Sequence, residues 1–440
     1  MSTEKKAVVV GGGMGGLFAA RVLSEHFDEV LIVDRDKEPT LAEPRAMVPQ
    51  GHHFHVLLPG GLDAMNGWFP GFTDDMVTAG SIKMRAGCDF VAYTNAGKSF
   101  SLQTYQPEPM DFGMNMYVQT RPALEQCVRN RVSALSNVHA QFQTIVEGPL
   151  FEDGRVAGVN VRGAEPISAD LVVDASGRNS VSARWLNDLG FTPAPETYVN
   201  CDVHYSSVMV RPKDWDAFEG AVMFVMPSGA QEHGSRMGTA VKMPDGLWLV
   251  GLGARYGDPA PTDWEGFRAF GKTLSYSIWD EMVETAEPVG QIKSYHLPRA
   301  VRRHYEQLEQ YPEGLLPIGD AVCFFNPTHG QGMSSAAGQC RGLEKILRAR
   351  AQSGQNFEGL AKEFFPVASD WVRGPWIMAA IGDFENPMCT GDFPDADLPD
   401  LIRFGELAAA ANTNPSLLPM IVGVSTLQVP LSAIHEFANV

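Results

Sequence analysis

The sequence predicts an α/β protein with a parallel-sheet domain, a second domain built on an antiparallel sheet, and a C-terminal helical segment. Three observations predict this fold class. A glycine-rich turn follows an apolar strand at the N-terminus, short strand-like segments fall between about residues 195 and 290, and helical and loop patterns follow residue 356. The chain has 440 residues, of which 44% are hydrophobic and 20% charged. That composition is typical of a folded protein of about two or three structural units.

The first forty residues predict a strand, a tight turn, a helix and a second strand, in that order. Val8 to Val10 are β-branched, as in a strand that is buried on both faces. Gly11, Gly13 and Gly16 fit the spacing Gly-x-Gly-x-x-Gly, and a helical run follows them. The second strand ends at Asp34, close to the ~20 positions that typically separate the turn from a ribose-binding carboxylate. We interpret this unit as a Rossmann-like dinucleotide site, because glycine lets backbone approach a pyrophosphate.

The middle of the chain predicts antiparallel strands joined by short loops, at 199–211, 221–226, 238–243 and 247–253. Gly251-Leu-Gly253 resembles a second nucleotide turn. The Arg-Tyr-Gly-Asp-Pro that follows it cannot open a helix at once. The sequence therefore predicts a single dinucleotide fingerprint.

A third block begins with a short apolar strand that ends in Gly319-Asp320. A loop with Pro327, Gly330 and Gly332 follows, and then a helix rich in small residues extends to about Arg350. The start of this helix lacks bulky side chains, so a flat or anionic group can approach it closely. Further helices are expected after residue 356.

Charge and cysteine content exclude several classes of protein. With 34 Lys and Arg against 52 Asp and Glu, the net charge of −18 disfavours a nucleic-acid-binding protein. The six cysteines form no Cys-x-x-Cys pair, and His52, His53 and His55 have no acidic or cysteine partner at a recognisable spacing, so no metal site is predicted. No signal peptide and no apolar run of about 18 residues are found, which predicts a cytoplasmic protein without an integral membrane segment.

The three blocks together resemble the FAD-dependent monooxygenases of the p-hydroxybenzoate hydroxylase fold. Its three fingerprints match the N-terminal glycine turn, Asp174-Ala-Ser-Gly-Arg178 and Gly319-Asp320, and the likeness covers about residues 1–350. Within that family, residues 44–58, 184–186 and 326–333 look like the epoxidases of polyether antibiotic biosynthesis, a branch of secondary metabolism. That clade usually carries Arg where this chain has His52.

The resemblance implies a discontinuous FAD-binding domain of the GR2-type at 1–85, 115–194 and 290–355. It implies a substrate-binding domain at 86–114 and 195–289, followed by a C-terminal helical region at 356–440. FAD is the expected cofactor, with Asp34 at the adenosine ribose, Asp320 near the ribityl and pyrophosphate groups, and Arg121 reaching the flavin. The expected FAD-binding residues are Gly11, Gly13, Met14, Gly15, Gly16, Asp34, Arg35, Arg45, Arg121, Asp174, Gly177, Gly319, Asp320, Pro327, Gly330, Gly332 and Met333.

Methionines predict an adaptable apolar substrate pocket, because the Met side chain is soft and unbranched. The expected lining residues are Met114, Met116, Met209, Met223 and Met226. Burial there is worth about 25 cal/mol per Å² of apolar surface, which favours a hydrophobic substrate. His329, in the loop expected beside the flavin, is the candidate catalytic residue.

The predicted function is insertion of one oxygen atom of O₂ into a hydrophobic olefinic or aromatic substrate, by epoxidation or hydroxylation through a flavin-C(4a)-hydroperoxide. The alternative is a flavin-dependent C=C reductase or dehydrogenase of the geranylgeranyl reductase type. A halogenase is disfavoured because no Trp-x-Trp-x-Ile-Pro occurs, and a binding or chaperone-like protein is disfavoured by the intact glycine motifs.

Ser176 bears on the source of the electrons. Family members that bind nicotinamide directly typically carry Asp-Gly in the middle fingerprint, whereas here Ser176 precedes Gly177. NADPH or NADH is therefore expected as the ultimate donor, acting through a separate flavin reductase. The expected partners are that reductase, O₂ and a hydrophobic small molecule.

Overall fold

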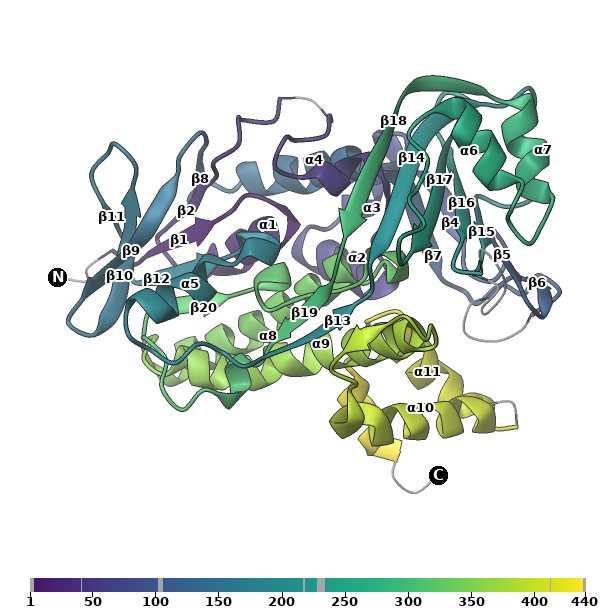
Figure 1. The fold of residues 1–440 in the computed structure, drawn as a ribbon. Coiled ribbons are helices and arrows are strands. Elements are labelled where there is room, and N and C mark those ends of the chain that lie inside the picture. The colour runs from purple at the N-terminus through teal and green to yellow at the C-terminus, as the bar shows by residue number, and fades with distance from the viewer. Residues whose placement is uncertain are drawn as a thin grey trace.

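The computed structural model describes residues 4–40, 42–101, 106–216, 218–227, 234–411 and 413–437. Its first layer is a five-stranded parallel sheet with the order β20-β12-β1-β2-β8 (Figure 1). The strands are β1 (Lys6–Val10), β2 (Glu29–Val33), β8 (Val138–Gln141), β12 (Leu171–Asp174) and β20 (Leu315–Pro317).

Both faces of the parallel sheet are covered, which explains the continuous apolar character of its strands. Ala7 and Val9 pack in the core beneath α1 (Met14–Leu23), α4 (Arg121–Ser133) and α8 (Gly332–Ser353). Val8 and Val10 pack on the opposite side. That side is covered by α5 (Val181–Asp188) and by a small antiparallel sheet of β9 (Val146–Glu152), β10 (Arg155–Val161) and β11 (Ile167–Ser168).

The second layer is a seven-stranded sheet with the order β18-β14-β17-β16-β15-β5-β6, antiparallel except for the β15–β5 pair. Its strands are β5 (Phe90–Thr94), β6 (Gly97–Ser99), β14 (Val203–Arg211), β15 (Val222–Val225), β16 (Met237–Met243), β17 (Leu247–Arg255) and β18 (Glu287–Leu297). The outer face packs against α6 (Trp264–Gly271) and α7 (Ile278–Thr285), two helices that the sequence analysis did not predict. Gly251 and Gly253 lie within β17, which agrees with their rejection as a nucleotide turn.

Two extended connections join the layers, as the long diagonal strands of Figure 1 show. The predicted strand 199–211 is two strands, β13 (Glu196–Asn200) and β14, because the chain turns at Asp202, where φ is +39°. β18 continues in the same way into β19 (Ala300–Arg303). β13 and β19 form a four-stranded sheet with β21 (Cys323–Phe324) and β22 (Thr390–Gly391).

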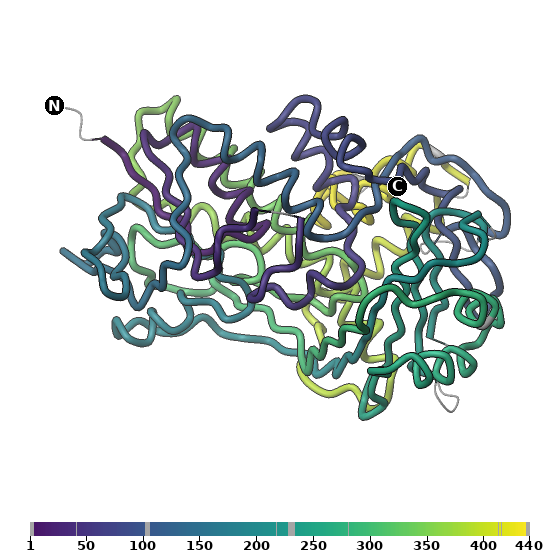
Figure 2. The backbone as a smooth tube through the Cα atoms, turned by 90° about the horizontal axis from the view of Figure 1, so that it is seen from above, coloured from purple at the N-terminus to yellow at the C-terminus, as the bar shows by residue number. Residues whose placement is uncertain are grey.

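The remaining elements cover the junction between the two layers. β3 (Phe54–Val56), β7 (Asn115–Thr120) and β4 (Ile82–Arg85) form a three-stranded sheet, and α2 (Pro59–Trp68) and α3 (Phe72–Thr78) follow β3. α9 (Leu360–Phe384) packs along α8, and α10 (Leu398–Ala410) and α11 (Leu418–Ser425) lie beside the junction in Figures 1 and 2. Within the described ranges, no helix has both the length and the apolar character needed to cross a membrane.

The predicted domain boundaries stay a prediction. Residues 1–3, 41, 102–105, 217, 228–233, 412 and 438–440 fall within the predicted segments but lie outside the described residues.

Candidate active site

A large cavity opens between the parallel sheet, the seven-stranded sheet and the C-terminal helices. Its volume is about 3090 Å³. Drug-sized ligands occupy pockets of about 300–1,000 Å³, so this cavity has room for a dinucleotide together with a second molecule. Most of the predicted cofactor residues line it: Gly11, Gly13, Met14, Gly15, Asp34, Arg35, Arg45, Arg121, Gly177, Gly319, Asp320, Pro327, Gly330, Gly332 and Met333.

Each of the three glycines of the first turn is required, or tolerated, for a different structural reason. Gly11 has φ of +107°, and a Cβ there would lie 2.5 Å from the carbonyl oxygen of Ala175. A Cβ on Gly16, which does not line the cavity, would collide with the carbonyl oxygen of Gly11 where α1 crosses β1. A Cβ on Gly13 would meet only Arg45 Nη2, at 3.6 Å. The first two glycines serve chain packing, and Gly13 leaves open space at the N-terminus of α1.

Asp34 lies at the carboxyl end of β2 and is held by its own neighbourhood. Its Oδ2 accepts hydrogen bonds from the backbone N–H of Gly12 at 2.8 Å and from Arg45 Nη1 at 3.0 Å. Its Oδ1 accepts the N–H of Asp36 at 2.8 Å. These bonds fix the carboxylate beside the glycine turn, as a ribose ligand requires.

A buried ion network supports this end of the cavity. Glu125 Oε1 lies 2.9 Å from Arg45 Nε and 2.9 Å from Arg129 Nη2, and its Oε2 lies 3.2 Å from Arg121 Nη2. Burial raises the pKa of Glu125, but the three arginines outweigh burial and hold that pKa below its ordinary value. Sequence reasoning missed Glu125 and Arg129. The four-residue spacing from Arg121 to Glu125 to Arg129, which is one face of a helix, is a signal that could have found them.

Arg121 connects α4 to the start of α8. Its Nη1 donates a hydrogen bond to the sulfur of Met333 at 3.0 Å. Thr120 caps α4 by accepting the N–H of Ala123 at 3.3 Å, so the backbone of this helix start is locally fixed. The guanidinium of Arg121 is thereby held at the cavity wall, where a cofactor would meet it.

The Gly-Asp motif lies at the turn after β20. Gly319 has φ of +65°, a backbone conformation that favours glycine, and its N–H donates to Gln339 Oε1 at 2.9 Å. The carboxyl of Asp320 faces the cavity. Burial raises its pKa above the ordinary value, and the positive charges of Arg121, Arg178 and Arg303 oppose that rise.

In the segment from Asp174 to Arg178, the first residue is a buried structural residue and residues after it line the cavity. Asp174 is fully buried outside the cavity lining, and its carboxylate accepts bonds from Ser176 Oγ at 2.5 Å, Ser180 Oγ at 2.6 Å and the N–H of Ser182 at 2.8 Å. Gly177, with nothing within 4 Å of a Cβ, faces the cavity. The structure thus places Asp174 as a support for the turn that carries Gly177.

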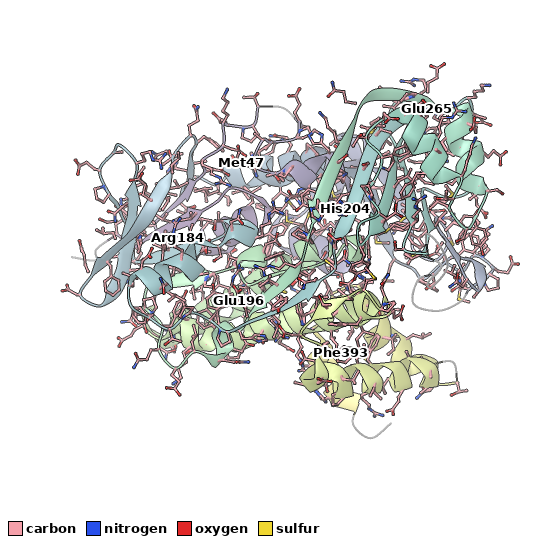
Figure 3. The ribbon with its side chains drawn as sticks, viewed as in Figure 1. Met47, Arg184, Glu196, His204, Glu265 and Phe393 are labelled. Atoms are coloured by element: carbon pink, nitrogen blue, oxygen red, sulfur yellow. The ribbon has the colours of Figure 1, made fainter. Side chains whose placement is uncertain are left out.

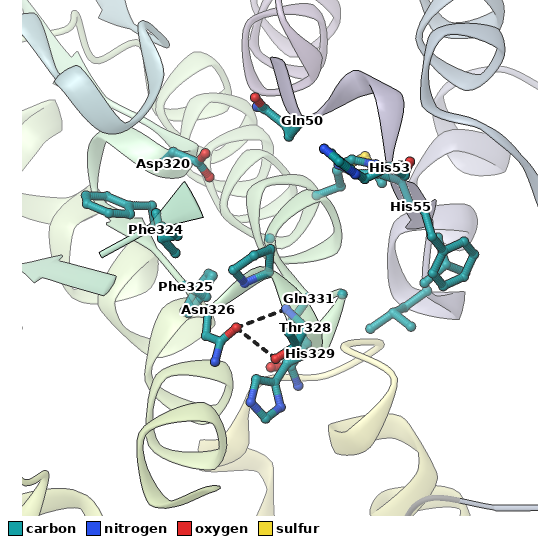
Figure 4. Close-up of a pocket in the computed structure, with 18 of the residues that line it drawn as sticks. Gln50, His53, His55, Asp320, Phe324, Phe325, Asn326, Thr328, His329 and Gln331 are labelled. Atoms are coloured by element: carbon teal, nitrogen blue, oxygen red, sulfur yellow. Dashed lines mark hydrogen bonds between the residues drawn. The ribbon is translucent and has the colours of Figure 1, made fainter. Parts of the chain in front are cut away.

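The loop between β21 and α8 is tied to the C-terminal region. Asn326 accepts the N–H and the hydroxyl of Thr328 at 3.1 and 2.7 Å, the bonds dashed in Figure 4. Its amide nitrogen donates to Asp383 Oδ1 at 2.7 Å, and the same oxygen lies 2.5 Å from Arg255 Nη1. Asp383 belongs to α9 and is 1% exposed. A helix outside the predicted FAD-binding domain therefore fixes the loop predicted to contact the flavin.

Two histidines lie on different sides of the cavity. His53 Nδ1 is 2.9 Å from Ser207 Oγ, its ring meets that of Tyr205 edge-on at 4.4 Å, and its buried Nε2 has no hydrogen-bond partner. Burial lowers the pKa of His53 to about 3, with help from neighbouring His55 and His52, so the ring is neutral at pH 7. His329 also lines the cavity, but Figure 4 shows its ring turned toward the C-terminal helices, away from His53. The catalytic role of His329, whose buried Nε2 also has no hydrogen-bond partner, stays a prediction. Sequence reasoning considered His53 only as a metal ligand and did not place it at this cavity.

Three of the five predicted methionines line the cavity. These are Met114, Met116 and Met226, whereas Met209 and Met223 do not line it. Met209 lies on the cavity-side face of β14 but packs in the core cluster of Leu249 and Val222 without reaching the lining. Met223 packs on the outer face of the sheet beneath α6 and α7, because side chains alternate along β15 and its cavity-facing positions are Val222 and Phe224. The expected place of Met223 in the pocket lining is corrected accordingly.

The C-terminal helices supply a wall that the sequence analysis did not anticipate. The cavity-lining residues of α10 and α11 are mostly apolar: Phe404, Ala408, Leu418, Pro419, Ile421, Val422 and Ser425. These residues form the part of the cavity wall that the C-terminal helices contribute. No local motif marks them, because they become a wall only once α9 has packed on α8.

The residues present fit FAD. A Cβ on Gly13, Gly15, Gly177 or Gly332 would meet no protein atom closer than 3.6 Å. The backbone at these four glycines therefore borders open space that the nucleotide and flavin halves of FAD could fill. Two helix N-termini, of α1 and α8, and two cations of the Glu125 network, Arg45 and Arg121, face the same space, which suits a pyrophosphate.

Comparison with known proteins gives the same assignment. Residues 4–360 match the family described as "FAD binding domain". Protein Rv3254 of Mycobacterium tuberculosis is 33% identical over 426 residues, covering 93% of this chain and 87% of the relative.

Solved structures of similar fold include PqsL, a probable FAD-dependent monooxygenase from Pseudomonas aeruginosa. It has a TM-score of 0.62 at 15% identity and covers 87% of this chain and 100% of PqsL. The flavin-dependent brominase Bmp2 has a TM-score of 0.67 at 15% identity, with 99% and 98% covered. The myxobacterial chondrochloren halogenase CndH has a TM-score of 0.62 at 18% identity, with 85% and 82% covered. The predicted fold class and FAD as the cofactor are confirmed.

Proposed function

The chain belongs to the FAD binding domain family of flavoproteins, and on that premise we propose that it is a monooxygenase. It inserts one oxygen atom of O₂ into a hydrophobic olefinic or aromatic substrate, by epoxidation or hydroxylation. The observation that carries this proposal is the continuity of the cavity. One space extends from the glycine turn after β1, past the loop before α8, to an apolar chamber under the seven-stranded sheet.

The protein holds FAD along the first part of that space. The turn at Gly13 and the N–H groups of α1 would hold the pyrophosphate, Asp34 would hold the adenosine ribose, and Asp320 would meet the ribityl side. Arg121 and the loop ending at Gly332 would lie beside the isoalloxazine ring of bound FAD. Bound FAD supplies the activation of O₂ and the transfer of oxygen.

The substrate chamber supplies binding and excludes water. Its walls include Met116, Phe224, Met226, Phe325 and Ile421, so an apolar substrate gains about 25 cal/mol per Å² buried. A dry chamber also limits loss of the reactive oxygen as hydrogen peroxide.

His53 gives this apolar chamber a polar group that could orient the substrate. Because its pKa is lowered to about 3, the ring stays neutral across the physiological range. Ser207 holds Nδ1, which leaves Nε2 to hydrogen-bond a hydroxyl or carbonyl group of the substrate and so orient the carbon to be oxidised.

Isotope labelling tests the proposed reaction. FAD-loaded protein is reduced, given ¹⁸O₂ and incubated with small molecules that co-purify with it, and with a panel of polyenes and polycyclic aromatics. One ¹⁸O atom is expected in the product by mass spectrometry. A saturated product without ¹⁸O would establish the geranylgeranyl reductase type of activity instead, and incorporation of added bromide would establish halogenation.

The electron source gives a separate prediction. We expect NADPH or NADH alone to reduce the bound FAD slowly, since Ser176 stands where an Asp would help to bind nicotinamide and its hydroxyl is engaged by Asp174. A purified flavin reductase with NADH should restore fast turnover. Anaerobic stopped-flow absorbance, with substrate present, measures the bleaching of the flavin band. Bleaching by NADPH alone at the rate of turnover would contradict this prediction and leave the monooxygenase proposal intact.

A further inference from the structure

A cluster of potential metal ligands lies outside the cavity, where β14 and β18 leave the seven-stranded sheet. Asp202, His204 and His296 each offer one ligand atom, and these three atoms lie within 4.8 Å of one another. None of the three residues lines the cavity. Within the described ranges, this is the one group of three or more such side chains that meets that spacing, and it does not include His52, His53 or His55.

Strand register explains why the two histidines meet. His204 and His296 are directly opposed in the antiparallel β14–β18 pair, and their rings stack with centroids 3.9 Å apart. Along β14, Tyr205 and Ser207 face the cavity, so His204 points to the outer face. Figure 3 shows His204 on the connecting strands between the two layers.

The distances suit a divalent ion. Asp202 Oδ1 lies 3.4 Å from His204 Nε2 and 2.8 Å from His296 Nε2. Zinc holds oxygen and nitrogen ligands at about 2.0–2.2 Å, so two ligands of a tetrahedral ion lie about 3.3–3.6 Å apart. The first pair already has that separation. The second must open by roughly 0.6 Å, and the two stacked rings must tilt so that both Nε2 lone pairs meet one ion. Rotations of these partly exposed side chains do both.

We propose that Asp202, His204 and His296 form a binding site for a borderline divalent transition-metal ion such as Zn²⁺, with water completing the coordination. Two imidazole nitrogens and one carboxylate form a donor set that binds such ions more tightly than it binds Mg²⁺ or Ca²⁺. This differs from the sequence-based expectation of no metal, because His296 is 94 residues from Asp202 and only the sheet brings them together.

The expected role of the ion is to hold together the two connecting strands that join the layers. Asp202 lies where β13 passes into β14, and its Oδ2 accepts the N–H of Gly257 at 3.2 Å. His296 lies next to the end of β18, just before the chain enters β19. An ion held by all three therefore joins both connecting strands and stabilises the folded state, by an amount that rises with the logarithm of the free ion concentration above the dissociation constant.

Calorimetry on EDTA-treated, FAD-loaded protein tests the site with Zn²⁺ as the probe. We expect one ion per chain, with a dissociation constant on the order of 1–10 µM, and a thermal midpoint that rises with added Zn²⁺. His204→Phe keeps the ring stack but removes a ligand, and it should abolish binding. Asp202→Asn tolerates the left-handed backbone and keeps its bond to Gly257, and it should weaken binding at least about tenfold.

Matched controls separate this site from other ligands. His139→Phe changes an exposed histidine on β8, and Cys88→Ser removes the one cysteine that is not buried; both should bind Zn²⁺ like the wild type. Co²⁺ should give a visible spectrum in the wild type that His204→Phe lacks. FAD content and basal activity should be unchanged in His204→Phe and Asp202→Asn. Wild-type protein without Zn²⁺ binding, or equal binding by wild type and Asp202→Asn, would overturn the proposal.

Discussion

Gly13→Val is expected to remove FAD from the protein while leaving the apoprotein folded. A Cβ at this position would meet only Arg45 Nη2 at 3.6 Å, so the chain itself has space for the new side chain. The backbone there has φ of −79° and ψ of −173°, which a β-branched residue accepts. The valine would occupy the space in which the pyrophosphate approaches α1. FAD affinity should fall at least about 100-fold, as measured by flavin fluorescence during titration of the apoprotein.

Gly16→Ala is the matched control for this prediction. Its Cβ would collide with the backbone of Gly11, so the packing of α1 on β1 must shift. We expect Gly16→Ala to lower the thermal midpoint of the apoprotein, whereas Gly13→Val should change its stability by less than about 1 kcal/mol. Normal flavin content in purified Gly13→Val would show that the dinucleotide lies elsewhere.

Asp383→Ala is expected to uncouple the consumption of O₂ from oxygenation of the substrate. Asp383 is buried on α9 and bonds both Asn326, at the start of the loop before α8, and Arg255. Its loss takes the carboxylate partner from Arg255, whose side chain is 10% exposed and lines the cavity. The cost in stability should therefore lie below the roughly 3–5 kcal/mol of a fully buried unpaired charge. The substitution also releases the loop that we place beside the flavin. We expect weaker FAD binding and a larger fraction of consumed O₂ released as hydrogen peroxide, measured by a peroxidase-coupled assay on reduced enzyme.

Two variants distinguish loop positioning from general destabilisation. Asp370→Ala removes another acid of α9, one that accepts a hydrogen bond from Ser432 in the C-terminal segment. It should lower the thermal midpoint without raising peroxide release. Asp383→Asn retains an acceptor for Asn326, so its peroxide release should be intermediate. Wild-type coupling in Asp383→Ala would show that α9 does not position the loop.

Local sequence was sufficient to predict the elements whose identifying signals lie close together in the chain. The strand, turn and helix from β1 to β2 were predictable because the signals that mark them lie within about 30 positions, as in the bond from Gly12 to Asp34. The neighbours of these strands in the sheet, β12 and β8, are more than 100 positions away and were not predictable in this way. The Gly319-Asp320 turn was predictable for the same reason, since φ of +65° favours glycine. Strand alternation was also present in the sequence: Met223 and Met226 are an odd number of residues apart and cannot share one face of a regular strand.

Tertiary packing decided the features whose partners are distant in the chain. The sequence by itself determined the FAD-binding turn, the fold class and the apolar character of the chamber. It could not place α11 as a wall of that chamber, join Asp383 to Asn326 across 57 residues, or bring His296 to Asp202. The physical reason is that residue type and spacing govern backbone conformation only over a few turns, whereas these contacts depend on how whole helices and strands pack and on the register in which they pair.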